Sequence, residues 1–485
     1  MEWTTLLQPL RIRMNSSVRK MNNDGRSEFK RDFDTVCNCT GLRRLQDKAQ
    51  VFPLEREDYA RTRLTHSIEV MSIAESLGVE AVSVIKDKNH YYPQDVNRLI
   101  QDIPIILRVA ALLHDMGNPP FGHLGEEIIA DWFRLNLPKL RFIDNGQMIY
   151  SDTNDTHSKM IINQLNDQMR EDFYNFEGNA QLLRLVTKLS NVVDENGMNL
   201  SFPVLATIIK YPKKSTEIDK NAGISSKKMG YMYSENEIYQ RINSQLGLGG
   251  KRHPLAFLLE AADDIAYLTA DIEDAQKKGI ISLADLLTIL EKHKADQFIF
   301  DIITEAQKYE EQWNKTPIPE HDNYIMQRLR IFIKGKMISA IKNAFNDNYL
   351  AIMRGEFEEE LLACSEACAM AQVIRGEIET KYIYYNYTIT RTKLQSYQII
   401  DNLLNRFVSC VFNEKGVGKS DDKDTLLYSL ISNNYRYVCE KNCKDKKYDD
   451  AECVYYKLLL VTDFVAGMTD TYAMDMYRLL TANSV

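Results

Sequence analysis

Residues 112–126 read LLHDMGNPPFGHLGE, and this stretch decides the fold. We expect an apolar helix to end at His114 and Asp115, because Pro119 and Pro120 interrupt the chain shortly after them. A helical protein presents metal ligands in this way, at the end of a helix. Alone, a neighbouring His–Asp pair is weak evidence, since such pairs occur by chance in long chains.

Two further residues strengthen the interpretation. His66 lies upstream in RTRLTHSIEV, and Asp263 lies downstream in EAADDIAY. Each is expected on the apolar stripe of its own helix; Val70, Ile73 and Leu77 follow His66 at helical spacing. Ionisable groups that point inward persist only when they are paired or bind a metal.

This ordered set predicts a centre for one divalent metal ion with His66, His114, Asp115 and Asp263 as ligands. Neutral imidazoles together with carboxylates suit Mn, Fe, Co, Ni, Zn or Mg. The structural alternative is a group of core histidines and helix caps whose hydrogen bonds are satisfied. That alternative explains any one of these residues, but it explains the ordered set poorly.

The sequence around these residues indicates a particular protein family. The spacing resembles that of the HD superfamily of metal-dependent phosphohydrolases, and the chain is similar in particular to the dGTP triphosphohydrolase family of the long bacterial type. The matching stretches run in order along the chain: LRRLQDKAQVFPLE (42–55), RTRLTHSIEV (61–70), LLHDMGNPPFGHLGE (112–126), FEGNAQLLRL (176–185), NLSFPVLATIIKYP (199–212), HPLAFLLEAADDIAYLTADIEDA (253–275) and DFVAGMTDTYAMDMYRLL (463–480).

Helical periodicity dominates the chain and predicts an all-α fold, and the resemblance implies that its core is an HD-domain helical core. We expect a catalytic domain with an N-terminal arm at 1–340 and a helical C-terminal subdomain at 341–485 packed on it. The aromatic run KYIYYNYTI (381–389) predicts a strand or small hairpin, and 137–157 is expected to be a loop. The expected helices are 68–80, 103–114, 124–135, 158–169, 255–275, 284–292 and 396–411.

Two neighbouring aspartates compete for the last ligand position. The family places a tyrosine four residues after its ligand and an aspartate four residues further on. Here these are Tyr267 and Asp271, so the resemblance selects Asp263. On a helix the three residues form one stripe, and the resemblance implies that Tyr267 and Asp271 contact the deoxyribose around its 3′-hydroxyl. Asp264 lies about 100° round the helix and is expected to form a salt bridge or to lie outside the ligand set.

His123 and Glu126 form a second functional pair. They lie one helical turn apart, so their side chains can touch. A carboxylate beside an imidazole selects its tautomer and raises its pKa. The resemblance implies that His123 acts at the α-phosphate and that Glu126 orients it. Whether His123 protonates the leaving 5′-oxygen or activates the attacking water stays open, and a helix cap with a surface ion pair is the structural alternative.

Basic side chains are expected to bind the triphosphate. Arg63 lies one turn before His66, where the resemblance implies a contact with the α-phosphate. Lys210, Tyr211 and Lys228 are weaker phosphate ligands, because lysine-rich loops are often simply solvated.

Sugar and base selection involve other positions. Gln50 and Val51 match the family positions that read the sugar: the amide reaches the 3′-hydroxyl, and the apolar neighbour leaves no room for a 2′-hydroxyl. Arg436 is a candidate contact with the base. Lys393 stands where an acidic residue is expected, so the base preference stays open.

Composition agrees with an intracellular enzyme. The chain has 485 residues, of which 44% are hydrophobic and 26% charged, enough for a large core. We see neither an N-terminal signal nor an apolar run of membrane-spanning length, and we expect a cytoplasmic location. The eight cysteines include no CxxC pair and should be free thiols. A metal site at Cys439, Cys443 and Cys453 is disfavoured, because a charged loop surrounds them.

The most specific interpretation is a deoxynucleoside triphosphate (dNTP) triphosphohydrolase that releases tripolyphosphate, with dGTP preferred. The alternatives are a dNTPase of other base preference, another HD nucleotide phosphohydrolase, or an inactive nucleotide sensor or nucleic-acid-binding protein. Intact ligands argue against lost activity, and the net charge of −8 argues against a general nucleic-acid coat. A local groove for single-stranded DNA stays open. The resemblance implies a homo-oligomer, with a hexamer suggested.

Overall fold

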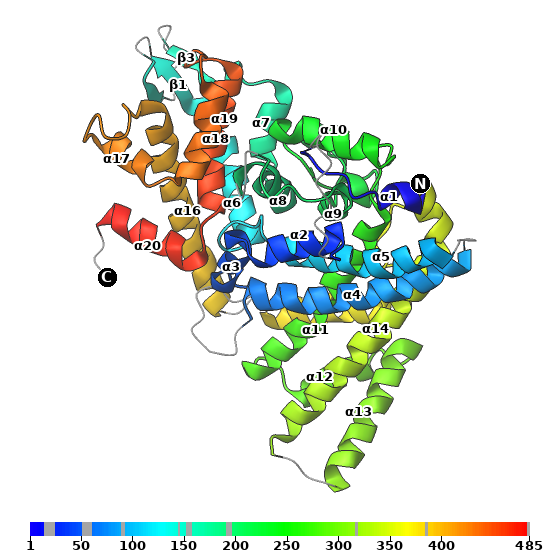
Figure 1. The fold of residues 1–485 in the computed structure, drawn as a ribbon. Coiled ribbons are helices and arrows are strands. Elements are labelled where there is room, and N and C mark those ends of the chain that lie inside the picture. The colour runs from blue at the N-terminus through cyan, green and yellow to red at the C-terminus, as the bar shows by residue number, and fades with distance from the viewer. Residues whose placement is uncertain are drawn as a thin grey trace.

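The computed structural model describes residues 1–13, 25–50, 61–88, 93–143, 146–151, 158–190, 196–315, 319–383 and 387–482. These residues form an almost entirely helical molecule, which confirms the predicted all-α class (Figure 1). The α-helices up to residue 245 are α1 (Trp3–Leu6), α2 (Glu28–Cys37), α3 (Thr40–Arg44), α4 (Arg63–Lys88), α5 (Pro93–Leu113), α6 (His123–Asn136), α7 (Asp167–Tyr174), α8 (Gly178–Arg184), α9 (Phe202–Ile208) and α10 (Asn236–Gln245).

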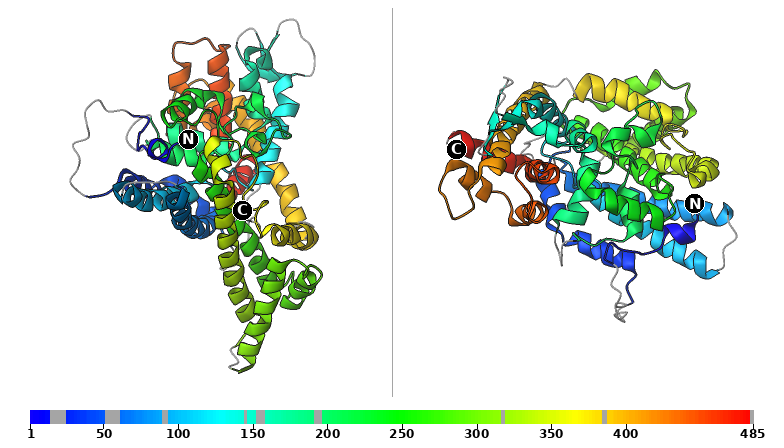
Figure 2. Two further views of the ribbon diagram at one scale, coloured as in Figure 1. Left: turned by 90° about the vertical axis from the view of Figure 1, so that its right-hand side faces the viewer. Right: turned by 90° about the horizontal axis from the view of Figure 1, so that it is seen from above.

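The remaining α-helices follow after residue 250. They are α11 (Pro254–Lys277), α12 (Leu283–Glu291), α13 (Gln297–Lys315), α14 (His321–Arg354), α15 (Cys368–Val373), α16 (Tyr387–Asn413), α17 (Lys423–Ser429), α18 (Asn433–Cys443), α19 (Ala451–Ala466) and α20 (Asp470–Thr481). The helices α12 and α13, with the adjoining part of α14, project from the rest of the molecule (Figures 1 and 2). Within the described residues, no helix has both the length and the apolar character needed to cross a membrane.

The long helices α4, α5, α11 and α14 pack side by side. Of the predicted metal ligands, His66 lies on α4, Asp263 lies on α11, and the other two directly follow α5. Val70, Ile73 and Leu77 are buried on α4, as their spacing predicts. The close approach of α4 to α5 depends on Gly78, because a Cβ there would lie 3.0 Å from the Cα of Pro104. This packing brings the start of α4, the end of α5 and the middle of α11 together.

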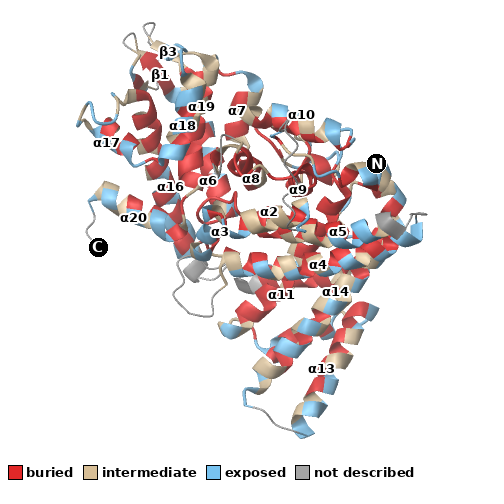
Figure 3. Cartoon of the chain, in the orientation of Figure 1, coloured by how far each residue is buried: buried red, intermediate tan, exposed pale blue. Residues whose placement is uncertain are grey.

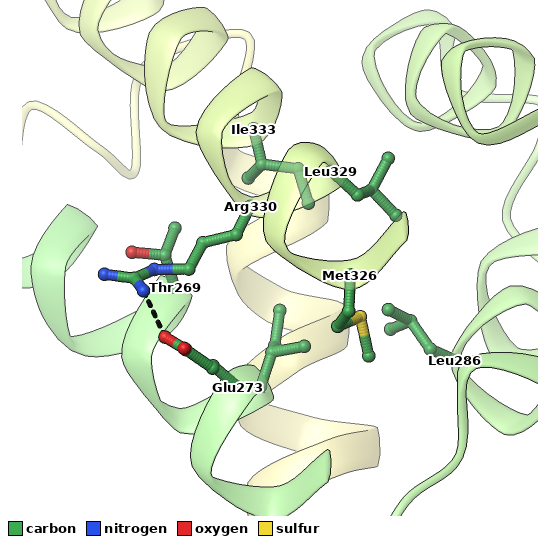
Figure 4. A pocket seen from close by; sticks show the side chains of 8 residues that line it. Thr269, Glu273, Leu286, Met326, Leu329, Arg330 and Ile333 are labelled. Carbon is green, nitrogen blue, oxygen red and sulfur yellow. Dashed lines mark hydrogen bonds and ion pairs between the residues drawn. The ribbon is translucent and has the colours of Figure 1, made fainter. Parts of the chain in front are cut away.

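A charged network fixes three of these helices relative to one another. Figure 4 shows Arg330 of α14 in contact with Glu273 of α11. Arg330 Nη2 also lies 2.7 Å from Glu69 of α4, and Arg61 bonds to both Glu69 and Glu273. The apolar side chains beside the Arg330–Glu273 contact are Leu286, Met326, Leu329 and Ile333. A half-buried network of several charges constrains geometry better than an isolated surface pair.

The C-terminal helices pack directly on the N-terminal half. Trp132 of α6 donates a hydrogen bond of 3.0 Å to Asn405 of α16. Arg184 of α8 is fully buried, and its guanidinium lies 2.6 Å from Asp463 of α19 and 3.3 Å from Glu235. Figure 3 shows buried residues along each of α8, α16 and α19. Removing one partner of such a buried cluster would leave an uncompensated charge, so these contacts hold the two halves together.

The proposed division of the chain at residue 340 stays a prediction. The helix α14 continues through that position as a single element from His321 to Arg354. The connection between the halves is therefore a long helix.

The expected strand or hairpin at 381–389 is wrong. Its described part is helical: residues Ile374–Ile383 form a π-helix, and α16 begins at Tyr387. Aromatic side chains favour strands when they can lie on a half-buried pleated surface, which is a property of the surroundings more than of the backbone. Here the segment instead leads into a long amphipathic helix.

A small antiparallel sheet occurs instead where a loop and the start of a helix were expected. Its strands are β1 (Leu140–Ile143), β2 (Met148–Tyr150) and β3 (Ser158–Met160), in the order β2-β1-β3. Arg141 of β1 pairs with Ile149 of β2 and with Met160 of β3. The expectation failed because the strands have only three or four residues each, too few for an alternating pattern to stand out.

Candidate active site

The four predicted metal ligands meet in one largely buried cluster, in which the Asp263 side chain is the most exposed. His66 lies in the first turn of α4, His114 and Asp115 follow the last residue of α5, and Asp263 lies in the middle of α11. Asp263 Oδ1 is 3.0 Å from His66 Nε2 and 3.4 Å from His114 Nε2. One donor atom each from His66, His114 and Asp115 lie within 4.8 Å of one another. The structure thus brings together residues that are about 200 positions apart in the chain.

Two atoms of this cluster fit a bound cation. His114 Nε2 and Asp115 Oδ2 are buried without a hydrogen-bond partner, and they lie 3.7 Å apart. His114 Nδ1 lies 2.6 Å from the carbonyl oxygen of Ala111. Donation from Nδ1 to this carbonyl leaves the lone pair on Nε2 for a metal. Two imidazoles and two carboxylates are a donor set suited to a divalent transition metal or Mg²⁺.

Charge compensation inside the cluster is strong. Burial lowers the pKa of His114, but the carboxylates of Asp115 and Asp263 outweigh burial and raise that pKa to about 9. Burial raises the pKa of Asp263, but His114 and His66 outweigh it and hold that pKa well below its ordinary value. The carboxylates therefore favour positive charge at this point, and a divalent cation can supply it in place of a proton.

Arg63 forms an ion pair with one of the predicted metal ligands, Asp115. Its Nη1 lies 2.9 Å from Asp115 Oδ1, and the side-chain amide of Asn118 donates to the same oxygen at 2.5 Å. Asp115 thus has one oxygen held by neighbours and the other available to a metal. The Arg63 guanidinium also fills the space beside Gly122, whose φ is +62°, so no side chain fits there. The expected contact of Arg63 with phosphate stays a prediction.

His123 and Glu126 form the expected pair on the first turn of α6. His123 Nδ1 lies 3.2 Å from Glu126 Oε2. Glu126 is buried and also accepts a 3.0 Å hydrogen bond from the backbone N–H of Gly178, whereas the His123 side chain is 77% exposed. The hydrogen bond and the charge of Glu126 raise the pKa of His123. A fixed carboxylate thus orients an imidazole that remains open to a ligand.

The pair lies in a polar groove of about 670 Å³. Lys228 lines this groove, and its Nζ lies 2.9 Å from Glu177 and 3.6 Å from Glu126. Lys210 Nζ lies 3.3 Å from Glu260 on α11. Tyr211 is buried and lies within the electrostatic influence of Lys210 and Lys228. The structure therefore places Lys228 in the His123 groove and pairs Lys210 with α11, and the contact of all three residues with phosphate stays a prediction.

Tyr267 and Asp271 continue the stripe of Asp263 along α11. Asp271 is buried. Burial, followed by the nearby carboxylates of Glu379 and Asp274, raises the pKa of Asp271 well above its ordinary value. Asp264, on the neighbouring face, pairs with Arg375 at 2.6 Å, as expected.

The remaining predicted contacts are less well defined. Gln50 keeps a buried side-chain oxygen without a hydrogen-bond partner. Val51 lies outside the described residues. Arg436 bonds to Asn433, and its guanidinium lies 5.4 Å from the ring centre of Tyr428. The described contacts of Arg436 do not join it to the metal cluster.

Sequence reasoning missed three residues that organise the site. Asn118 holds Asp115, Glu177 holds Lys228, and Asp470 holds the backbone of Phe121. Each lies in a stretch that resembles the family, namely 112–126, 176–185 and 463–480. Resemblance marked these stretches, but a polar residue that acts through a neighbour has no spacing signal of its own.

The chain is similar to known proteins over nearly its whole length. A model of the HD domain family matches residues 63–184. The chain is 39% identical to a deoxyguanosinetriphosphate triphosphohydrolase-like protein of Listeria monocytogenes, with 99% of both chains covered, and equally similar to that of Listeria innocua. It is 31% identical to the deoxyguanosinetriphosphate triphosphohydrolase of Salmonella paratyphi A, with 94% of this chain and 93% of that one covered.

Substitution of the two neighbouring aspartates tests the metal cluster. We expect Asp263→Ala to lose bound divalent metal, because this carboxylate faces both histidines. Asp264→Ala should retain it, because Asp264 is bonded to Arg375 instead. Metal content after dialysis, measured by plasma mass spectrometry, distinguishes the two. Loss of metal only from Asp264→Ala would contradict the assignment of the ligand.

Proposed function

The chain belongs to the deoxyguanosinetriphosphate triphosphohydrolase family, and we propose that it hydrolyses dNTPs to a deoxynucleoside and tripolyphosphate, with dGTP as the preferred substrate. One observation carries the proposal: a largely buried His–His–Asp–Asp cluster includes His114 and Asp115, which lie nine and eight residues before an exposed histidine held by a buried carboxylate. The first can hold a divalent cation, and the second can transfer a proton beside it.

The metal site would consist of His66, His114, Asp115 and Asp263. When bound, a divalent ion neutralises a phosphate oxygen and lowers the pKa of a coordinated water. Mn, Mg, Co, Ni, Fe or Zn all suit these ligands. Arg63 would keep Asp115 in the orientation that leaves its second oxygen for the ion.

His123 would act as the catalytic residue at the α-phosphate, with Glu126 as its positioning residue. The exposed Nε2 can give a proton to the leaving 5′-oxygen or take one from the attacking water. Glu126 selects the tautomer by accepting from Nδ1. Lys210 and Lys228 would bind the remaining phosphates, since a triphosphate needs cations beyond the metal, and Tyr211 would contribute a neutral hydroxyl.

Deoxyribose selection would rest on Tyr267, Asp271 and Gln50 around the 3′-hydroxyl. A ribonucleotide would place its 2′-hydroxyl in a site without a partner, which costs roughly 1–3 kcal/mol. Val51 and Arg436 are further proposed contacts, to the sugar and the base. A hexamer, a single-stranded DNA groove and a cytoplasmic location likewise stay predictions.

Product analysis tests the reaction. The protein is incubated with each of the four dNTPs and with GTP in the presence of Mn²⁺ or Mg²⁺, and products are separated by anion exchange. We expect tripolyphosphate and deoxynucleoside, fastest from dGTP, and little turnover of GTP. Asp263→Ala, prepared in parallel, controls for contaminating phosphatases. Monophosphate with pyrophosphate, or diphosphate with orthophosphate, would contradict hydrolysis at the α-phosphate.

Substitution of the His–Glu pair tests the proton-transfer step. We expect His123→Ala to lower kcat by at least about 100-fold with metal content and KM nearly unchanged, because acid–base groups contribute about 10²–10⁴-fold. Glu126→Gln should lower kcat less. Glu126 raises the pKa of His123. Loss of the Glu126 carboxylate should therefore lower that pKa and move the limb of the pH–rate profile that reports His123 to lower pH.

Glu127→Gln is the matched control, because Glu127 is the exposed neighbour that lines the same groove. It should leave kcat and the pH profile unchanged. If His123→Ala instead lost its metal, the residue would be a ligand. Near-normal kcat in both His123→Ala and Glu126→Gln would contradict the catalytic role and would show that the pair serves only as a helix cap.

A further inference from the structure

A carboxylate from the C-terminal helix reaches the strained turn that precedes His123. Asp470 is the first residue of α20 and is buried. Its Oδ1 accepts a 2.9 Å hydrogen bond from the backbone N–H of Phe121, and its Oδ2 accepts one of 2.9 Å from the backbone N–H of Ala49. One side chain thus binds two segments that are far apart in the sequence, each with its own oxygen.

The first of these segments sets the direction of His123. Phe121 has a φ of +65° and Gly122 a φ of +62°. A bulky L-residue is sterically disfavoured in the left-handed region, so such a conformation persists only where the surroundings determine it. The N–H of Phe121 is held by Asp470, and the N–H of Gly122 donates to Pro119 at 3.1 Å. His123, the next residue, begins α6.

The second segment borders the metal cluster. The Lys48 carbonyl oxygen accepts a 2.8 Å hydrogen bond from the N–H of Arg63, the residue that orients Asp115. The buried Lys48 Nζ donates to the carbonyl oxygens of Asn118, at 2.5 Å, and of Ala466, at 3.0 Å. Lys48 therefore joins the turn after the ligands to the end of α19, in parallel with Asp470.

We propose that Asp470 is a positioning residue that fixes the turn at Phe121–Gly122 and the segment at Ala49 simultaneously, so that the C-terminal helix α20 sets the geometry of the active site. The inference rests on the proposed function for its kinetic consequence. Its structural part, the clamping of two backbone segments by one carboxylate, concerns the folded chain alone.

The chemistry of the contact requires a carboxylate. Both partners are backbone N–H donors, and an ionised aspartate offers an acceptor to each. Asparagine has one carbonyl oxygen, so in Asp470→Asn one of the two N–H groups would face an amide nitrogen that is also a donor. The substitution therefore keeps the size of the side chain and removes one of its two bonds.

The experiment compares Asp470→Asn with Asp475→Asn. Asp475 lies on the same helix but is exposed, and its described ion pair is with Arg478 within that helix. We measure backbone hydrogen–deuterium exchange by mass spectrometry in peptides covering 44–50 and 116–123, together with kcat, KM and metal content.

We expect Asp470→Asn to accelerate exchange in one or both peptides. It should also lower kcat about 10- to 100-fold, because small misplacement of a catalytic group is costly. KM should change less and metal content should persist. Asp475→Asn should match the unsubstituted protein in every measurement. If Asp470→Asn does not fold, Asp470→Glu replaces it, since it keeps both oxygens but displaces them by one methylene.

Unchanged exchange in both peptides would overturn the clamp. Normal kcat despite faster exchange would overturn its role in catalysis. Faster exchange throughout the molecule would make Asp470 an ordinary stability residue and would also overturn the proposal. If the unsubstituted protein hydrolyses none of the dNTPs, the proposed function fails, and the exchange measurement still decides whether the clamp exists.

Discussion

Two imidazoles and two carboxylates share one largely buried space where α4, α5 and α11 meet, and the rest of the structure depends on this constraint. Isolated charges cannot stay there, so Asp263 lies between His66 and His114 within 3.4 Å of both. The charges of the cluster compensate one another, but only if the helices that carry them are held at fixed positions. The contacts of Arg330 and Arg61 with Glu69 and Glu273 provide them, since they join α4, α11 and α14 beside the cluster.

Each ligand is in turn oriented by a neighbour. The Ala111 carbonyl selects the tautomer of His114, and Asn118 occupies one oxygen of Asp115 together with an arginine. Further out, Asp470 holds the backbone that leads from the ligands to His123. Supporting contacts of this kind determine where ligands and catalytic groups point. They also explain why residues close to the C-terminus belong to a site whose ligands lie in the first 263 residues.

The grouping of His66, His114 and Asp115 could be predicted from the sequence because helix ends and apolar stripes have regular spacing, whereas Asp263 was chosen over Asp264 by resemblance to the family. Long helices such as α4, α11 and α16 could be predicted from the same regular spacing. The three-stranded sheet could not, since Leu140–Ile143 and its partners are too short to carry a pattern. The helix at Ile374–Ile383 was obscured by aromatic residues whose strand preference depends on context. Nor could the ion pair of Arg63 with Asp115 or the contacts of Asp470 with Phe121 and Ala49 be predicted, because contacts between residues far apart in the sequence leave no local signature.

The claim that four side chains hold one ion is tested most directly by diffraction from crystals grown with Mn²⁺, recorded where manganese scatters anomalously. We expect one strong anomalous peak per chain within coordination distance of His66, His114, Asp115 and Asp263. A peak bonded to Asp264 in place of Asp263, or a strongest peak elsewhere in the molecule, would contradict it.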